Sequence, residues 1–166
     1  MIIFGDEVSG GMEHAGATQT SLGSLDHEIH HSYFSKSVIP ENGNSGWMDE
    51  AIVVWRQRGF KISKKPNYKR HNLACHSRFR RSTDLQSYDA GSSFIGYLAY
   101  LFKEKGIDFK TVLRNYYAEY EYKVVNTKTF REFLEKSYGE SLLGEFRQYV
   151  CNPRLFKKCK RRHNPH

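Results

Sequence analysis

Apolar residues are grouped along the chain in a way that predicts two short strands followed by helices. The run Ile2–Phe4, followed by glycine-containing turn sequence, indicates a short strand, and Met12–Thr20 can extend as a second strand. A helix follows, which Ser21 or Ser24 can cap and which ends at Pro40 and a polar loop. The apolar residues of this helix are Leu25, Ile29 and Phe34.

Helical patterns dominate the rest of the chain. A second helix is predicted from near Trp47 to Gly59, and its apolar residues on more than one side favour a buried position. The basic stretch 60–84 has no clear period and is expected to be mostly loop. From residue 87 onwards, helical spacing predicts an apolar stripe ending at Gly106, a second stripe over 109–117, and helices over 127–139 and 141–150. The predicted fold class is mainly α with a small β element at the N-terminus.

Length and composition indicate one globular domain. The chain has 166 residues with 39% apolar content, enough for one core, which we expect over 1–152 with a basic, disordered tail over 153–166. No apolar run approaches a membrane span, and the first residues do not form a signal peptide, which favours a cytoplasmic protein. Cys75, Cys151 and Cys159 are widely spaced and odd in number, so we interpret them as free or incidental thiols.

The net charge of +8 is concentrated in the tail and in a segment between residues 51 and 83 that lacks acidic residues. Aromatic residues such as Tyr68 and Phe79 lie among these charges, as they do in some nucleic-acid-binding surfaces. No nucleic-acid-binding motif accompanies them, so a solvated basic surface is favoured and nucleic acid is not an expected partner. A nucleic-acid-binding module that uses segment 56–81 and the tail is retained as an alternative.

Residues 27–50 carry the most informative chemical pattern. In a helix, His27 and His31 are one turn plus about 40° apart, so both imidazoles project from one face and can share one Zn²⁺. Glu28 can hold the metal-bound water as general base, and Glu50, after an 18-residue gap, can supply a third ligand from the next helix. The alternative is that a polar helix carries this motif by chance. The neighbouring His30 is consistent with that alternative, because it shows that histidine is locally abundant.

Two further motifs flank this pattern. The first is Gly10-Gly11-Met12-Glu13, where the glycines can let a substrate backbone approach and the carboxylate can lie near a free amino group. Taken alone, this motif favours a turn. Tyr88, at the start of an apolar helix in Tyr88-Asp89-Ala90-Gly91, can donate to an oxyanion, although alone it reads as a packing or surface residue.

Together and in this order, the motifs resemble the M1 family of zinc aminopeptidases, which belongs to the gluzincin group. That family has G-x-M-E-N on a strand, H-E-x-x-H followed after 18 residues by Glu, and Y-x-x-G opening a helix. The matching segments here are 10–13, 27–31, 47–50 and 88–91. The resemblance covers residues 1 to about 150 and implies part of a thermolysin-like zinc peptidase catalytic core.

The resemblance implies a function for the residues of the metal motif. His27, His31 and Glu50 would bind one zinc ion per chain. Glu28 would activate water, and Tyr88 would stabilise the oxyanion. The implied reaction is zinc-dependent hydrolysis of a peptide bond, with removal of N-terminal residues.

The resemblance also implies a peptide substrate. The backbone of Gly10, Gly11 and Met12 would align the peptide, and Glu13 would bind its amino terminus. His14 stands where the family usually has Asn, and the M61 glycyl aminopeptidases, which carry a G-G-x-E-H-like stretch, are similar in this respect. The family's N-terminal β-sandwich domain has no counterpart here, so we expect either a fragment of a longer protein with a missing N-terminal domain, a truncated gene product or a chain that needs a partner. An endopeptidase, or an inactive remnant that still binds zinc, would also carry these metal-binding residues.

Overall fold

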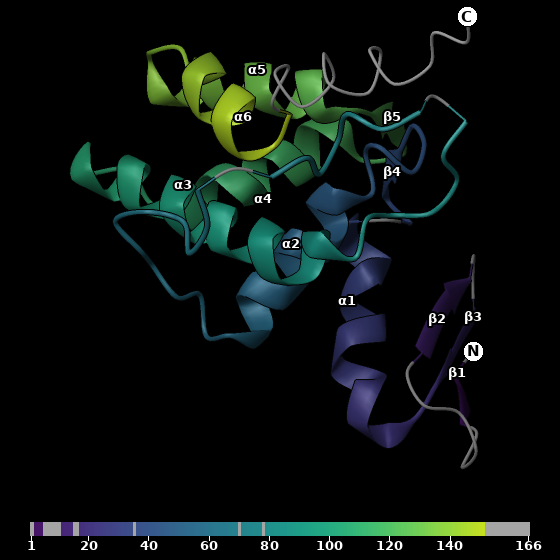
Figure 1. Ribbon diagram of the computed structural model, residues 1–166. Coiled ribbons are helices and arrows are strands. Elements are labelled where there is room, and N and C mark those ends of the chain that lie inside the picture. Colours follow the sequence, from purple (N-terminus) through teal and green to yellow (C-terminus); the bar gives the residue numbers. More distant parts are fainter. Residues whose placement is uncertain are drawn as a thin grey trace, which may run out of the picture.

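The computed structural model describes residues 2–4, 11–14, 17–34, 36–69, 71–77 and 79–151. The predicted tail over 153–166, Cys159 and the predicted substrate-binding residue Gly10 lie outside the described residues. The described part is mainly helical, with a small N-terminal sheet beside the first helix and the later helices gathered on the other side of the second helix (Figure 1). This agrees with the predicted fold class.

Three short strands form the N-terminal sheet. They are β1 (Ile2–Phe4), β2 (Gly11–His14) and β3 (Ala17–Thr20), in the order β1-β3-β2. β1 pairs with β3 in parallel, and β2 pairs with β3 antiparallel, with Glu13 opposite Thr18. The prediction of one strand over 12–20 was therefore wrong, because the chain reverses between β2 and β3.

The first helix, α1 (Leu25–Phe34), follows the 3₁₀ turn η1 (Leu22–Ser24). Its apolar residue Ile29 is 38% exposed, whereas the polar residues Glu28 and His31 are buried at 4% and 1% exposure. Burial of polar groups costs free energy unless they have partners, so a helix that buries these groups indicates a functional site. Ser21, one of the two alternative predicted caps, makes no side-chain capping hydrogen bond at the start of η1.

The second helix, α2 (Trp47–Gln57), is the centre of the molecule. Trp47, at the start of this helix, is fully buried, and its indole Nε1–H donates a hydrogen bond to Oγ1 of Thr127 at 2.9 Å. Both sides of α2 are buried, as its apolar pattern predicted. Its buried residues are Trp47, Met48, Asp49, Ala51, Ile52, Val53, Val54 and Trp55.

The remaining helices cover α2 and complete the core. They are α3 (Ser92–Glu104), α4 (Phe109–Tyr120), α5 (Thr127–Tyr138) and α6 (Leu143–Tyr149), preceded by the π-helical turn η2 (Ser87–Gly91). Two of them have side-chain caps. Asp108 accepts from backbone N–H groups at the start of α4, and Asn126 does so at the start of α5. No helix in the described ranges is long and apolar enough to cross a membrane.

A second small sheet was not predicted. β4 (Val38–Pro40) pairs in parallel with β5 (Lys123–Val125), with Ile39 opposite Val124. The sequence analysis assigned Pro40 to a loop. Each strand has three residues and its partner lies far away in the sequence, so neither carries the alternating pattern by which strands are recognised.

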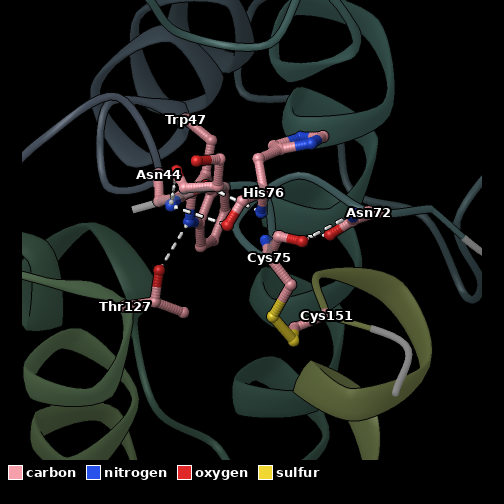
Figure 2. Close-up of a disulfide and its surroundings, with 8 residues drawn as sticks. Asn44, Trp47, Asn72, Cys75, His76, Thr127 and Cys151 are labelled. Carbon is pink, nitrogen blue, oxygen red and sulfur yellow. Dashed lines mark hydrogen bonds between the residues drawn. A yellow bond between two sulfur atoms is a disulfide. The ribbon is translucent and has the colours of Figure 1, made fainter. Parts of the chain in front are cut away.

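The segment between α2 and η2 is mostly irregular, as predicted, but a disulfide ties it to the end of α6. Cys75 and Cys151 are bonded, with their Cα atoms 5.3 Å apart (Figure 2). The interpretation of both as free or incidental thiols was wrong. Nearby, the Asn44 side chain accepts from the His76 N–H at 2.9 Å and donates to the Ser77 carbonyl at 3.1 Å. The irregular segment is therefore held at several points to the helical core.

Candidate metal centre

The helices α1 and α2 bring two imidazoles and one carboxylate together. Nε2 of His27 lies 3.3 Å from Oε2 of Glu50, and Nε2 of His31 lies 3.5 Å from the same oxygen. One ligand atom from each of the three residues lies within 4.8 Å of the others. Tetrahedral zinc ligands at about 2.0–2.1 Å from the metal would be about 3.3 Å from one another. The observed separations are therefore those of a site that could hold a metal ion.

The other ring nitrogen of each histidine meets a hydrogen-bond acceptor. Nδ1 of His31 lies 2.5 Å from Oδ2 of Asp49, and Nδ1 of His27 lies 3.0 Å from Oε1 of Gln57. Since a carboxylate and an amide oxygen only accept hydrogen bonds, both Nδ1 atoms carry the proton. Each neutral imidazole then has its lone pair on Nε2, the atom that faces Glu50. This is the tautomer that a metal-binding histidine requires.

Three electron-pair donors consequently converge on one small volume. Oε2 of Glu50 is buried and accepts no hydrogen bond of normal geometry from the described residues. The Glu50 carboxylate beside the ring raises the pKa of His27 above its ordinary value, although partial burial opposes the shift. A site with this donor set either takes up a proton or binds a cation, and two imidazoles with a carboxylate suit zinc.

Glu28 and Tyr88, the two predicted catalytic residues, lie in different surroundings. Glu28 is buried on α1, next to the predicted ligand His27. The Tyr88 hydroxyl donates to Oε1 of Glu50 at 2.8 Å, and its ring stacks on that of His27 with centroids 5.9 Å apart. Tyr88 is 37% exposed, so its hydroxyl belongs to the open side of the cluster.

A close helix contact holds Tyr88 beside the cluster of His27, His31 and Glu50. Tyr88 lies on η2, which packs on α2 at Gly91, where an added Cβ would lie 2.8 Å from Cβ of Ala51. Real Cβ atoms do not approach so closely, so only glycine allows this contact. A π-helical turn of this kind is frequent at functional sites.

The predicted substrate-binding residues lie on the small sheet. Gly11, Met12 and Glu13 form part of β2, which packs beside α1. Their side chains are outside the described set, as is all of Gly10. The structure therefore places the backbone of this strand beside α1, the helix that carries His27 and His31.

Sequence analysis missed two residues of the cluster, Asp49 and Gln57. Asp49 directly precedes the predicted ligand Glu50, and its buried carboxylate orients His31. A metal-binding histidine almost always donates its second N–H to such a group, so an acidic residue beside a ligand was a usable signal. Gln57, close to the end of the predicted helix, carries no comparable signal.

Comparison with known proteins shows the fold. No protein-family model matches the chain, and no curated protein sequence matches it. A native structure of leukotriene A4 hydrolase from Saccharomyces cerevisiae is similar, with a TM-score of 0.63, 18% identity and coverage of 83% of this chain. The yeast enzyme in complex with bestatin gives a TM-score of 0.59, 17% identity and 86% coverage.

The fold is thus mainly helical with small sheets and resembles part of the catalytic domain of leukotriene A4 hydrolase, an M1 peptidase. A further native structure of the yeast enzyme has a TM-score of 0.53 and 20% identity over 81% of this chain. The chain spans only 28%, 29% and 27% of the three yeast chains. At these identities the comparison establishes the architecture, and the chemistry has to be argued from the residues.

Proposed function

We propose that this chain carries a zinc peptidase centre that hydrolyses peptide bonds and releases N-terminal residues. The convergence of His27, His31 and Glu50 is the observation that carries the proposal. The Nε2 atoms of both histidines and the buried Glu50 oxygen face one another, and a cation between them would satisfy all three groups. The likeness in fold to part of leukotriene A4 hydrolase supports the same conclusion independently.

The remaining residues of the site have separate functions in this proposal. Bound zinc would act as a Lewis acid and lower the pKa of a water molecule towards about 7. Glu28, adjacent to a ligand without being one, takes the proton from the attacking water and delivers it to the leaving amine. Tyr88 turns its hydroxyl from Glu50 to the oxyanion that forms on the scissile carbonyl.

Release of N-terminal residues is inferred from strand β2. This strand lies beside α1, and among the described strands it stands at one end of the sheet order β1-β3-β2. A peptide that lies along Gly11 and Met12 would bring its protonated amino group towards Glu13, and a carboxylate there forms a charge-assisted hydrogen bond. The yeast structure solved with bestatin supports a peptide-like ligand for this type of fold.

Hydrolysis of a matched pair of peptides tests the proposal. The zinc-loaded protein is expected to cleave short peptides with a free amino terminus faster than the same peptides acetylated at the N-terminus. Glu28→Gln should retain zinc and lower kcat by about 10²- to 10⁴-fold, because it removes the general base and no ligand. Glu132→Gln, an exposed residue of α5, serves as the matched control and should leave both quantities unchanged.

A Glu13→Ala variant tests the aminopeptidase part. It should keep zinc and lose most of the preference for free amino termini, a loss of about tens- to hundreds-fold in kcat/KM. Equal cleavage of free and acetylated peptides by the unmutated protein would identify an endopeptidase instead. Retained zinc without turnover on any peptide would identify an inactive zinc-binding remnant.

A further inference from the structure

A cavity of about 640 Å³ opens beside the proposed metal centre. Asp49 and Glu50 form one wall of this cavity, so it reaches the side of α2 from which the third proposed ligand projects. A second wall is formed by residues of segment 79–83. This segment belongs to the basic stretch that sequence analysis assigned to a solvated surface.

Two glycines hold that wall close to the metal-binding helix. The Gly43 N–H donates to the Arg80 carbonyl at 3.2 Å, and an added Cβ on Gly43 would lie 2.6 Å from the Ser82 carbonyl oxygen. An added Cβ on Gly46 would lie 2.1 Å from Oγ1 of Thr83. The backbone of segment 80–83 therefore lies directly on the loop that leads into α2. Its position relative to Glu50 is fixed by these contacts.

The two arginines of this wall differ in their partners. The Arg80 guanidinium lies 3.3 Å from Oδ2 of Asp84, and its Nε donates to the Ser82 carbonyl at 2.9 Å. Arg81 lines the same cavity and is exposed, and it has no ion pair or hydrogen bond to any residue that the structure describes. Arg81 therefore brings to the cavity a positive charge that no described residue neutralises.

The carboxylates of the cavity wall already have partners. Asp49 accepts from His31, and Oε2 of Glu41 accepts from Nδ2 of Asn126 at 3.1 Å. Glu50 faces the two imidazoles and accepts from the Tyr88 hydroxyl. Among the residues that the structure describes, none of these carboxylates pairs with Arg81, so the described part of the chain leaves the N–H donors of its guanidinium to an anion that enters the cavity.

We propose that the cavity receives a carboxylate of the peptide substrate and that Arg81 binds it. A guanidinium presents two parallel N–H donors that match the two oxygens of a carboxylate. The carboxylate is either an acidic side chain near the scissile bond or the C-terminus of a short peptide. This inference rests on the proposed peptidase function for the reaction, but the binding itself can be measured without turnover. Because Arg81 is exposed, solvent screens the pair, and we expect a gain of about threefold to fivefold in affinity.

Calorimetric titration of the zinc-loaded Glu28→Gln protein separates the two sources of the carboxylate. One pair of probes is Ala-Glu-Ala-amide and Ala-Gln-Ala-amide, which differ in a side chain. The other pair is Ala-Ala-Ala with a free and with an amidated C-terminus. In at least one pair the carboxylate peptide should bind about threefold to fivefold more tightly than its neutral counterpart. Adding Arg81→Gln should reduce this ratio of affinities to about one. Arg147→Gln, which changes an exposed arginine on α6 outside the cavity, should preserve it.

The outcomes distinguish this inference from the proposed function. A carboxylate preference that Arg81→Gln removes supports the inference even if no peptide is ever hydrolysed. Hydrolysis by the unmutated protein with no carboxylate preference in either pair would overturn the inference and leave the peptidase function standing. A preference that survives in Arg81→Gln, or a failure of all four peptides to bind, would also overturn it.

Discussion

The Nδ1 atom of His31 lies 2.5 Å from Oδ2 of Asp49, and both side chains are almost fully buried. This contact fixes the orientation of the imidazole and keeps its proton on Nδ1, so that Nε2 is available on the side of Glu50. Asp49 and Glu50 are consecutive on α2. One turn of helix thus supplies a proposed ligand and the group that orients another.

Asp49→Asn should weaken zinc binding by about 10- to 100-fold. The neutral amide replaces a charge-assisted hydrogen bond, and its N–H group can favour the tautomer whose proton lies on Nε2. Competition with a fluorescent zinc chelator measures the affinity. Asp108→Asn, at the start of α4, is the matched control and should not alter it, since Asn also caps helices. Zinc affinity of Asp49→Asn within twofold of the parent would refute the proposed orienting function.

The close packing of η2 on α2 provides a second prediction. Gly91→Ala places a Cβ 2.8 Å from Cβ of Ala51, and overpacking of this kind costs about 1–3 kcal/mol of stability. The variant should also lower kcat, because Tyr88 moves away with η2. Thermal unfolding and peptide hydrolysis measure the two effects.

Two further variants check that the effect comes from this contact. Gly144→Ala in α6 meets no atom within 4 Å and should be neutral or slightly stabilising. Adding Ala51→Gly to Gly91→Ala should recover part of the stability, since it removes the clashing atom. Additive losses in the double variant would show that the two positions do not clash.

The disulfide provides a third prediction. It links residues 76 positions apart, so it restricts a long loop in the unfolded chain and typically contributes about 2–4 kcal/mol. A reducing agent should therefore lower Tm by several degrees, about 2–4 °C per kcal/mol for a chain of this size. The variant Cys75→Ala/Cys151→Ala should start at the lower Tm and should not respond to reductant. An equal response in both proteins would assign the effect to something other than this bond.

Local pattern and spacing predicted much of the helical architecture. The buried character of α2 followed from apolar residues on more than one side, and Gly139, with φ of 82°, ends α5 as the sequence indicated. The spacing of His27, His31 and Glu50 predicted that they approach one another, because one helix face and one following helix determine their positions. The structure brings these three residues together.

Long-range features could not be predicted in the same way. The pairing of β4 with β5 and the bond between Cys75 and Cys151 join segments that lie far apart in the sequence, and neither leaves a local signal. The contact of the Asp49 carboxylate with His31 had a usable signal in the sequence, whereas the wall formed by Arg81 depends on how segment 79–83 packs against the loop before α2. Its composition predicted that the basic segment forms a solvent-exposed surface, whereas part of this segment lines a cavity beside Glu50.

Metal content is the most direct test of the central claim that His27, His31 and Glu50 form a zinc site. The unmutated protein and the triple variant His27→Ala/His31→Ala/Glu50→Ala are loaded with zinc and desalted. Mass spectrometry then measures the zinc content per chain of each protein. Circular dichroism confirms that both proteins remain helical. A milder variant, Glu50→Gln, covers the case in which the triple variant does not fold. The account predicts about one zinc per chain in the unmutated protein, a lower content in Glu50→Gln and almost none in the triple variant. Undiminished zinc in both variants, or no zinc in the unmutated protein, would contradict it.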